Sequence, residues 1–200
     1  MATVDVALVL AVDSSGSISD EDLALQFHGY ADAVTSEAFL NAVRSGPCGQ
    51  IAITFVAWSS ANRQEQVVPW TLLDGMSVAR KFASALIHPP GLIPGYTSIS
   101  GAIDFSVRLL AQCKFDPVRQ VIDVSGDGTN NDGRTIIDAR DAAIADGITI
   151  NGLPIIGREP NIAGYYAENV VGGPAAFITV AKDIASFHSA VLQKLVAEIA

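Results

Sequence analysis

Charged residues are scarce in this sequence, and the positive ones do not cluster. Only 16% of the 200 residues are charged, against about 25% in typical soluble domains, and half are hydrophobic. The net charge of −9 and the lack of a basic cluster argue against nucleic-acid binding through phosphates and against an anionic membrane surface. An acidic chain does suit a protein that holds a divalent cation.

Long apolar runs are also missing. No stretch reaches the roughly 18 apolar residues that a membrane-spanning helix needs, so we expect a soluble chain with no membrane insertion. Residues Met1-Ala2-Thr3 lead straight into an apolar run and contain no signal peptide. The chain is therefore either cytosolic or the mature part of a periplasmic or secreted protein, with a slight preference for the extracytoplasmic location.

Cysteine is rare: Cys48 and Cys113 are far apart and show no metal-binding spacing. Each follows an expected helix and precedes an expected central strand, so both should lie at the same edge of a sheet. Two free thiols and one disulfide both remain open, and a disulfide would need Cα atoms within about 7 Å.

Strand-like apolar runs alternate with helical patterns along the chain, without an internal repeat, so we expect one domain over residues 1–200. The expected strands are Val4–Val12, Ile51–Trp58, Gln66–Leu72, Arg119–Ser125, Ile148–Pro154 and Ala176–Val180. The first expected helix begins with a capping-box pattern at Ser19 and continues through Ala38. Further helices are expected at Ser77–Ile87, at Ser98–Cys113, from after the loop that ends at Gly133 to about Ala145, near Ile162–Val171, and from Ile184 to Ile199.

This alternation predicts an α/β fold that is doubly wound and Rossmann-like. A mostly parallel central sheet of about six strands should carry helices on both faces. The run Gln66–Leu72 contains Pro69 and more polar residues than the others, which indicates one antiparallel edge strand.

Three oxygen-rich loops follow strands or lead into helices at one edge of this sheet. The first contains Asp13, Ser15 and Ser17, the second ends at Thr97, and the third places Asp127 between two glycines. Taken alone, each pattern is an ordinary helix cap or Asp-Gly turn. Ligands of such sheets bind at the carboxyl ends of the strands, so the coincidence of all three loops there predicts a site.

The combination is more specific than its parts. Asp-x-Ser-x-Ser, then Gly-x-Thr at a helix start, then a strand ending in Ser-Gly-Asp-Gly resembles the metal-ion-dependent adhesion site of von Willebrand factor A domains. The likeness covers nearly the whole chain. The phrases VDVALVLAVDSSGSI and VIDVSGDG are most similar to a bacterial family of such domains whose function is not established.

The resemblance implies which side chains hold the metal. The implied ligands are Asp13, Ser15, Ser17, Thr97 and Asp127, with the hydroxyls on the ion and the aspartates acting largely through water. One position departs from the pattern, because Gly126 stands where many members have threonine or serine. Asn131 and Asp132 lie close enough to the third loop's aspartate to support water ligands of the metal. We also expect Tyr96, Tyr165 and Tyr166 near the rim of the site.

Oxygen donors of this kind suit Mg²⁺, Mn²⁺ or Ca²⁺ and do not favour zinc. Two carboxylates nearly balance the ion's charge, and neutral hydroxyls leave it a strong Lewis acid with an open position. We therefore expect a metal-dependent, non-enzymatic module that binds an acidic residue of a protein partner. The surrounding loops, His88–Tyr96 and Asn130–Asp132, would supply further contacts.

The alternative is a metal-dependent phosphatase or aspartyl phosphotransferase with Asp13 as nucleophile. Phosphatases of the haloacid dehalogenase type need a second aspartate two residues on, where this chain has Ser15. The phosphate loop Gly-x-x-x-x-Gly-Lys and the serine-hydrolase motif Gly-x-Ser-x-Gly are both missing from the sequence. These departures favour binding over catalysis.

Overall fold

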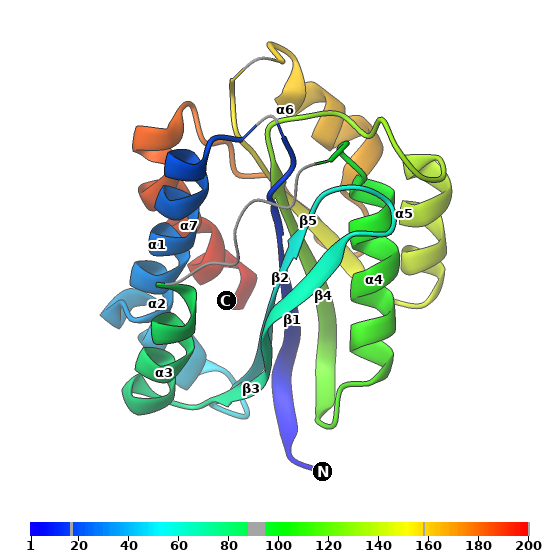
Figure 1. Cartoon of the computed structure of the whole chain (residues 1–200). Helices are drawn as coiled ribbons and strands as arrows, with labels where there is room; N and C mark the ends of the chain where they lie inside the picture. The colour runs from blue at the N-terminus through cyan, green and yellow to red at the C-terminus, as the bar shows by residue number, and fades with distance from the viewer. Residues whose placement is uncertain (17, 88–94, 158, 200) are drawn as a thin grey trace.

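The computed structural model describes residues 1–16, 18–87, 95–157 and 159–199; the predicted ligand Ser17 and loop residues 88–94 lie outside the described residues. A central sheet has the strand order β3-β2-β1-β4-β5 (Figure 1). β1, β2, β4 and β5 are parallel and β3 is antiparallel to β2. The strands are β1 (Thr3–Asp13), β2 (Ile51–Trp58), β3 (Gln64–Leu73), β4 (Asp116–Gly126) and β5 (Thr149–Pro154).

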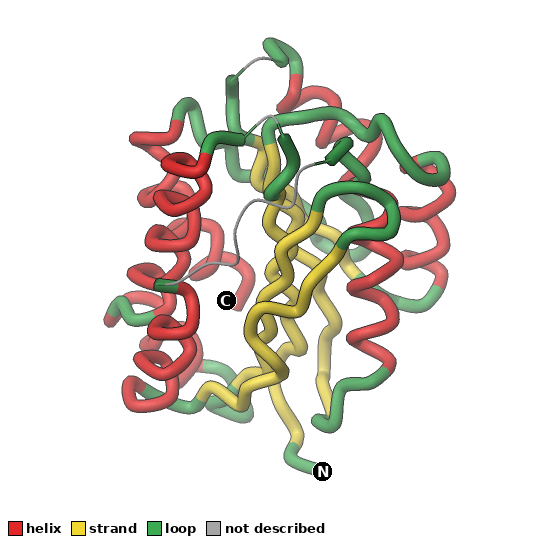
Figure 2. Tube along the Cα trace, in the orientation of Figure 1, coloured by secondary structure: helices red, strands yellow, loops and turns green. Residues whose placement is uncertain are grey.

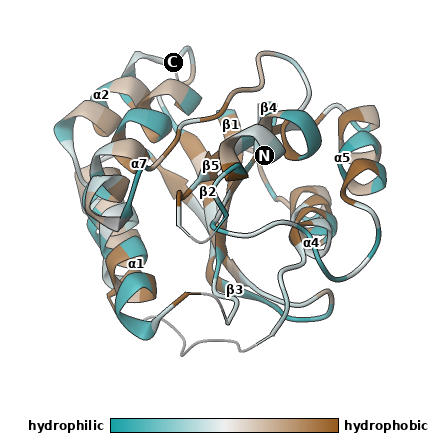
Figure 3. Ribbon diagram, turned by 90° about the horizontal axis from the view of Figure 1, so that it is seen from above, coloured by the Kyte–Doolittle hydropathy of each residue, from teal (hydrophilic) through white to brown (hydrophobic). Residues whose placement is uncertain are grey.

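Helices cover both faces of the sheet, as the view from above shows (Figure 3). One face carries α1 (Asp20–Val34), α2 (Glu37–Ser45), α3 (Met76–Leu86) and α7 (Ile184–Ile199). The other face carries α4 (Ile99–Ala111), α5 (Ile136–Ala145), α6 (Ile162–Tyr165) and the π-helix η1 (Tyr166–Val170). Among the described residues, no helix combines the length and apolar character needed to cross a bilayer.

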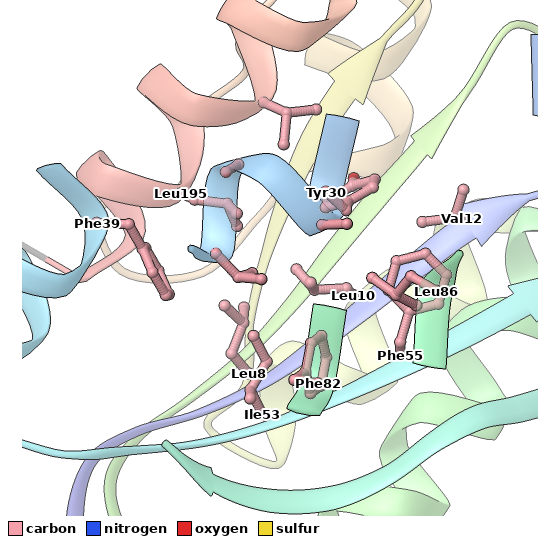
Figure 4. Packing of buried hydrophobic residues seen from close by; sticks show 14 of the residues in the cluster. Leu8, Leu10, Val12, Tyr30, Phe39, Ile53, Phe55, Phe82, Leu86 and Leu195 are labelled. Carbon is pink, nitrogen blue, oxygen red and sulfur yellow. The ribbon is translucent and has the colours of Figure 1, made fainter. Parts of the chain in front are cut away.

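The sheet's central strand explains why the sequence is so apolar. In β1 every residue from Val4 to Asp13 is buried, because side chains on both faces of a doubly covered strand meet helices. Leu8, Leu10 and Val12 face the layer of α1, α3 and α7 (Figure 4), where Phe55 of β2 packs edge-on against Tyr30 of α1 at 5.3 Å between ring centroids. The α/β, mostly parallel fold is therefore confirmed.

The first helical region differs from the prediction. The expected helix from Ser19 through Ala38 is two helices, because α1 ends at Val34 and the Ser36 hydroxyl accepts a hydrogen bond from the Phe39 amide at 3.2 Å, which starts α2. Ala38 is exposed and does not extend the buried face of α1. Ser36 lies in the middle of the apolar pattern, and its hydroxyl caps a new helix instead of continuing the first one.

The outer edge beyond β5 also differs in detail. The segment expected as a sixth strand, Ala176–Val180, lies parallel to β5 and pairs with it through one isolated bridge, Gly152–Ile178, with a second, Ile155–Ala181, just beyond both segments. The sheet among described residues therefore has five named strands. The predicted antiparallel edge strand is present as β3, in which Pro69 occupies a partly exposed ladder.

Both cysteines are free thiols and are partly buried. Cys48 precedes β2, where its amide donates to the Asp5 carboxylate at 2.9 Å, and Cys113 follows α4. Of the two alternatives left open by the sequence, the structure has the free thiols.

Candidate metal site

The loops predicted to carry the site gather above the carboxyl ends of β1 and β4 (Figure 2). β1 and β4 are adjacent and in register at Val12 and Ser125, so Asp13 and Gly126 end neighbouring strands side by side. Two positions far apart in the sequence are thus brought together by strand order alone.

Asp13 is fully buried at the end of β1. Its Oδ1 atom accepts a hydrogen bond from the Ser15 amide at 2.7 Å, which folds the first loop back over the strand end. Ser14 fixes the same loop to β2, because its amide and its hydroxyl both donate to the Trp58 carbonyl, at 2.8 and 3.0 Å. The loop is therefore held from both sides.

Thr97 comes to this loop from the start of α4. Its Oγ1 atom lies 3.4 Å from the Ser15 Oγ atom, and both side chains are buried. Asp13, Ser15 and Thr97, predicted from separate motifs, thus meet at one point. Ser17 is not among the described residues, so its predicted place in the cluster stays a prediction.

Asp127 follows β4 and is half-buried beside the cluster. With Ile155 and Gly157 of the loop after β5, it lines a small cavity of about 130 Å³. Its negative charge acts on both Asp13 and Tyr166. The second carboxylate predicted for the site is therefore close enough to influence the first.

Burial dominates the electrostatics of Asp13. Burial raises the pKa of Asp13 to about 7, and the charge of Asp127 raises it further, while hydrogen bonds from Ser15 oppose the shift. The Oδ2 atom is buried and has no hydrogen-bond partner among the described residues. A buried acceptor without a partner calls for an explanation, and a bound cation supplies one.

The donors present fit a hard divalent ion. Carboxylate and hydroxyl oxygens are the ligands that Mg²⁺ and Ca²⁺ prefer. In the part of the chain that the structure describes, no three His, Cys, Asp or Glu side chains gather as a metal-binding group. A typical histidine- or thiolate-rich transition-metal site is thus not formed by these residues.

Comparison with known proteins identifies the family. Residues 3–200 match the family described as "Protein of unknown function (DUF1194)". The chain belongs to this family. A search of curated proteins by sequence gave no match.

Solved structures show that this DUF1194 chain has the fold of von Willebrand factor A domains. The pilus adhesin SpaC from Lactobacillus rhamnosus GG matches with a TM-score of 0.72 at 14% identity, over 98% of this chain and 30% of the adhesin. The vWF domain of the type V pili tip protein Mfa5 from Porphyromonas gingivalis matches at 0.65 and 12%, over 100% and 96%.

A third structure contains a metal. Proximal thread matrix protein 1 from the mussel byssus, with a zinc-occupied MIDAS motif, matches with a TM-score of 0.64 at 14% identity, over 98% of this chain and 46% of the byssus protein. The DUF1194 chain thus spans less than half of the SpaC chain and of the byssus chain.

Sequence reasoning missed the residues that hold the loops of this DUF1194 chain in place. The turn after β2 fixes the second loop, because the Ser59 carbonyl accepts from the Ser98 amide at 2.8 Å and the Ser60 hydroxyl accepts from the Tyr96 amide at 2.9 Å. Since β2 is parallel to β1, its carboxyl end lies at the same edge, which was the available signal.

The third loop has the same role. The Asn130 side chain accepts from the Ser100 amide at 2.8 Å, and the Asp132 carboxylate accepts from the Ala61 amide at 2.8 Å. Asn131 and Asp132, which the sequence suggested as supports for water ligands, bind backbone groups of neighbouring loops. They therefore hold the loops of the site together, and their predicted contact with water ligands stays a prediction.

Three tyrosines surround the cluster. Tyr96, next to Thr97, is 69% exposed, and the Tyr165 hydroxyl accepts from the Asn130 amide at 3.1 Å. Tyr166 is fully buried, and burial together with the charges of Asp13 and Asp127 raises the pKa of its phenol well above the usual value. Its hydroxyl is therefore protonated at neutral pH.

Proposed function

We propose that this chain, acting as one domain over residues 1–200, binds a divalent cation and uses it to hold a carboxylate of a protein partner. The ion would be Mg²⁺, Mn²⁺ or Ca²⁺. Its ligands would be Asp13, Ser15, Ser17 and Thr97, with Asp127 acting through water. The observation that carries the proposal is the meeting of Asp13, Ser15 and Thr97 from two loops, together with a buried Asp13 Oδ2 atom that has no described partner.

Charge balance supports the choice of partner. Two carboxylates offset the charge of a divalent ion, and the hydroxyls of Ser15 and Thr97 add none. An incoming carboxylate therefore meets a cation with little surplus negative charge around it, and can bind at its open coordination position. Stripping water from both groups costs much of that attraction, so the exposed rim, including Tyr96, must contribute to affinity.

Binding is favoured over catalysis by the position of Asp13. Its side chain is fully buried, and Oδ1 is already occupied by the Ser15 amide. An aspartyl nucleophile needs an oxygen that a phosphate ester can reach, and the side chain of Asp13 is 0% exposed. The pilus adhesin and pilus-tip protein among the structural neighbours also support an adhesion role and a surface-associated or extracellular location.

The first experiment measures the ion. Titration calorimetry with Mg²⁺, Mn²⁺, Ca²⁺ and Zn²⁺ should give one site in the wild-type chain and none in Asp13→Asn. Asp74→Asn is the matched control, because Asp74 is an exposed aspartate at the opposite end of the sheet. Zinc is included because the mussel byssus protein holds it. Unchanged binding in Asp13→Asn would contradict the assignment.

The second experiment measures the partner's chemistry. A random displayed-peptide library is panned on the immobilised chain in Mg²⁺ and eluted with a chelator. The enriched peptides should share an aspartate or glutamate, and replacing that residue by its amide should abolish binding. Peptides that bind equally well in chelator, or to Asp13→Asn, would show that the surface or the mechanism is wrong.

A further inference from the structure

Tyr166 is a buried residue that the proposed ligand set does not use. It is the first residue of η1, and π-helical turns of this kind occur often at functional sites. Its side chain is on the same face of the sheet as Asp13, and it is 0% exposed. Among the described residues, its hydroxyl has no hydrogen-bond partner.

Two glycines make room for this tyrosine. A Cβ atom at Gly152 of β5 would lie 2.8 Å from the Tyr166 Cδ1 atom, so any side chain there would displace the ring. A Cβ atom at Gly126 of β4 would lie 2.9 Å from the Tyr166 hydroxyl oxygen. Both strands therefore have a glycine, with no side chain, where Tyr166 packs against the sheet.

The space above Gly126 is shared with the candidate metal site. The same Cβ atom would lie 2.8 Å from the Asp13 Oδ2 atom, so the phenol oxygen and the carboxylate oxygen flank one point. Both oxygens are buried, and each lacks a partner among the described residues, so they are close but not hydrogen-bonded to each other in this structure. One is a hydrogen-bond donor and the other accepts only.

We propose that, when the cation is bound, the Tyr166 hydroxyl turns to donate a hydrogen bond to Asp13 Oδ2 and positions this carboxylate toward the ion. The inference rests on the proposed function. With Ser15 on Oδ1 and Tyr166 on Oδ2, both carboxylate oxygens would be oriented by donors and would keep a lone pair for the ion or its water. The phenol thereby supplies the hydroxyl that the chain lacks at position 126, where the family it resembles often has threonine or serine.

The test is a set of variants whose affinity for Mg²⁺ is measured by calorimetry. Tyr166→Phe removes only the hydroxyl and should weaken binding roughly tenfold or more, as is usual for groups that orient metal ligands. Tyr30→Phe is the control, since Tyr30 is also fully buried but packs on the opposite face of the sheet. Its affinity for Mg²⁺ should match that of the wild type.

A second variant tests whether the phenol oxygen lies where the proposal needs it. Gly126→Ser should weaken Mg²⁺ binding, because the new Cβ meets both the Asp13 Oδ2 atom and the phenol oxygen. Tyr166→Phe removes the second of these contacts, so Gly126→Ser should cost less Mg²⁺ affinity in Tyr166→Phe than in the wild type. In the wild type, Mg²⁺ should also produce a tyrosine ultraviolet difference signal that Tyr166→Phe lacks.

The outcomes distinguish this inference from the proposal beneath it. If Asp13→Asn abolishes Mg²⁺ binding while Tyr166→Phe binds as the wild type does, only the role of Tyr166 is overturned. If the wild type binds no divalent ion, both fail. If Tyr166→Phe loses affinity but Mg²⁺ gives the wild type no tyrosine difference signal, the loss comes from packing and the positioning role is rejected.

Discussion

Thr97 and Asn131 hold each other through two reciprocal hydrogen bonds. The Thr97 amide donates to the Asn131 side-chain oxygen at 2.8 Å, and the Asn131 amide donates to the Thr97 carbonyl at 2.8 Å. The pair joins the loop before α4 to the loop after β4, and these loops carry one hydroxyl and one carboxylate of the candidate metal site. The position of Thr97 thus depends on a residue that touches no predicted ligand atom.

Asn131→Ala tests this dependence. The substitution leaves the Thr97 amide without its acceptor and should cost about 1–2 kcal/mol in free energy of unfolding, together with a severalfold loss of Mg²⁺ affinity. Urea unfolding and calorimetry measure the two effects. The matched control is Asn41→Ala, which removes only a surface contact with Arg44. Full Mg²⁺ affinity in Asn131→Ala would mean that the loop keeps Thr97 in place without this pair.

The hydroxyl of Thr97 can be separated from its shape. Thr97→Val keeps the volume of a buried side chain but removes the oxygen, whereas Thr97→Ser keeps the oxygen and loses a methyl group. If Oγ1 binds the ion, Mg²⁺ affinity should fall tenfold or more in the valine variant and change little in the serine variant. Equal losses in both would indicate that Thr97 acts through packing.

The fold was predictable because burial on both faces makes parallel strands almost wholly apolar. β1 and β2 have that character throughout, and β3, with Pro69, lacks it. The break between α1 and α2 was missed because Ser36 satisfies the Phe39 amide locally, which a pattern of apolar spacing does not register. The apolar segment around Ile178 likewise has the sequence pattern of a strand, although it pairs with β5 through an isolated bridge.

The nearness of Asp13 and Thr97 was predictable, because one ends a strand and the other precedes a helix at the same edge of the sheet. The supports of the site were not, because the contacts of Asn131 with Thr97 and of Ser60 with Tyr96 span 34 and 36 residues. An asparagine or serine in a loop has many possible partners, and only the strand order selects one. Gly126 was visible in the sequence as a departure from the pattern, but the Asp13 carboxylate and the Tyr166 hydroxyl that crowd it were not.

Tyr96 offers a test of the rim that leaves the ion alone. Its ring is 69% exposed beside Thr97, while the Ser60 hydroxyl fixes its backbone. Large aromatic residues often contribute much of the energy of a protein interface. Tyr96→Ala should weaken binding of the selected acidic peptides severalfold and leave Mg²⁺ affinity unchanged. Tyr96→Phe separates the ring from its hydroxyl, and unchanged peptide binding in Tyr96→Ala would place the rim contact elsewhere.

A second group of buried charges lies beneath α7, on the face of the sheet opposite Asp13. Lys194 is 0% exposed; it lies 2.8 Å from Asp123 of β4 and forms an ion pair with Glu198. Asn151 donates to Glu198 at 2.7 Å. Burial raises the pKa of Asp123 to about 6. At Lys194 burial alone would lower the pKa, but the charges of Asp123 and Glu198 outweigh it, and the pKa of the lysine is raised.

Lys194→Met should destabilise the fold, and more so at high pH. Removing the cation leaves two buried carboxylates unpaired, which costs about 3–5 kcal/mol. Without the lysine, the folded-state pKa of Asp123 rises above its present value of about 6, while the unfolded value stays near 3.8. The folded state then holds the proton more tightly, so stability is retained below the unfolded pKa and lost as pH rises through the folded one.

The measurement is the urea midpoint of unfolding at pH 5 and at pH 8. The midpoint of Lys194→Met should fall further below that of the wild type at pH 8 than at pH 5, whereas the exposed-site control Lys81→Met should show no such difference. An equal deficit at both pH values would mean that the lysine contributes packing rather than charge.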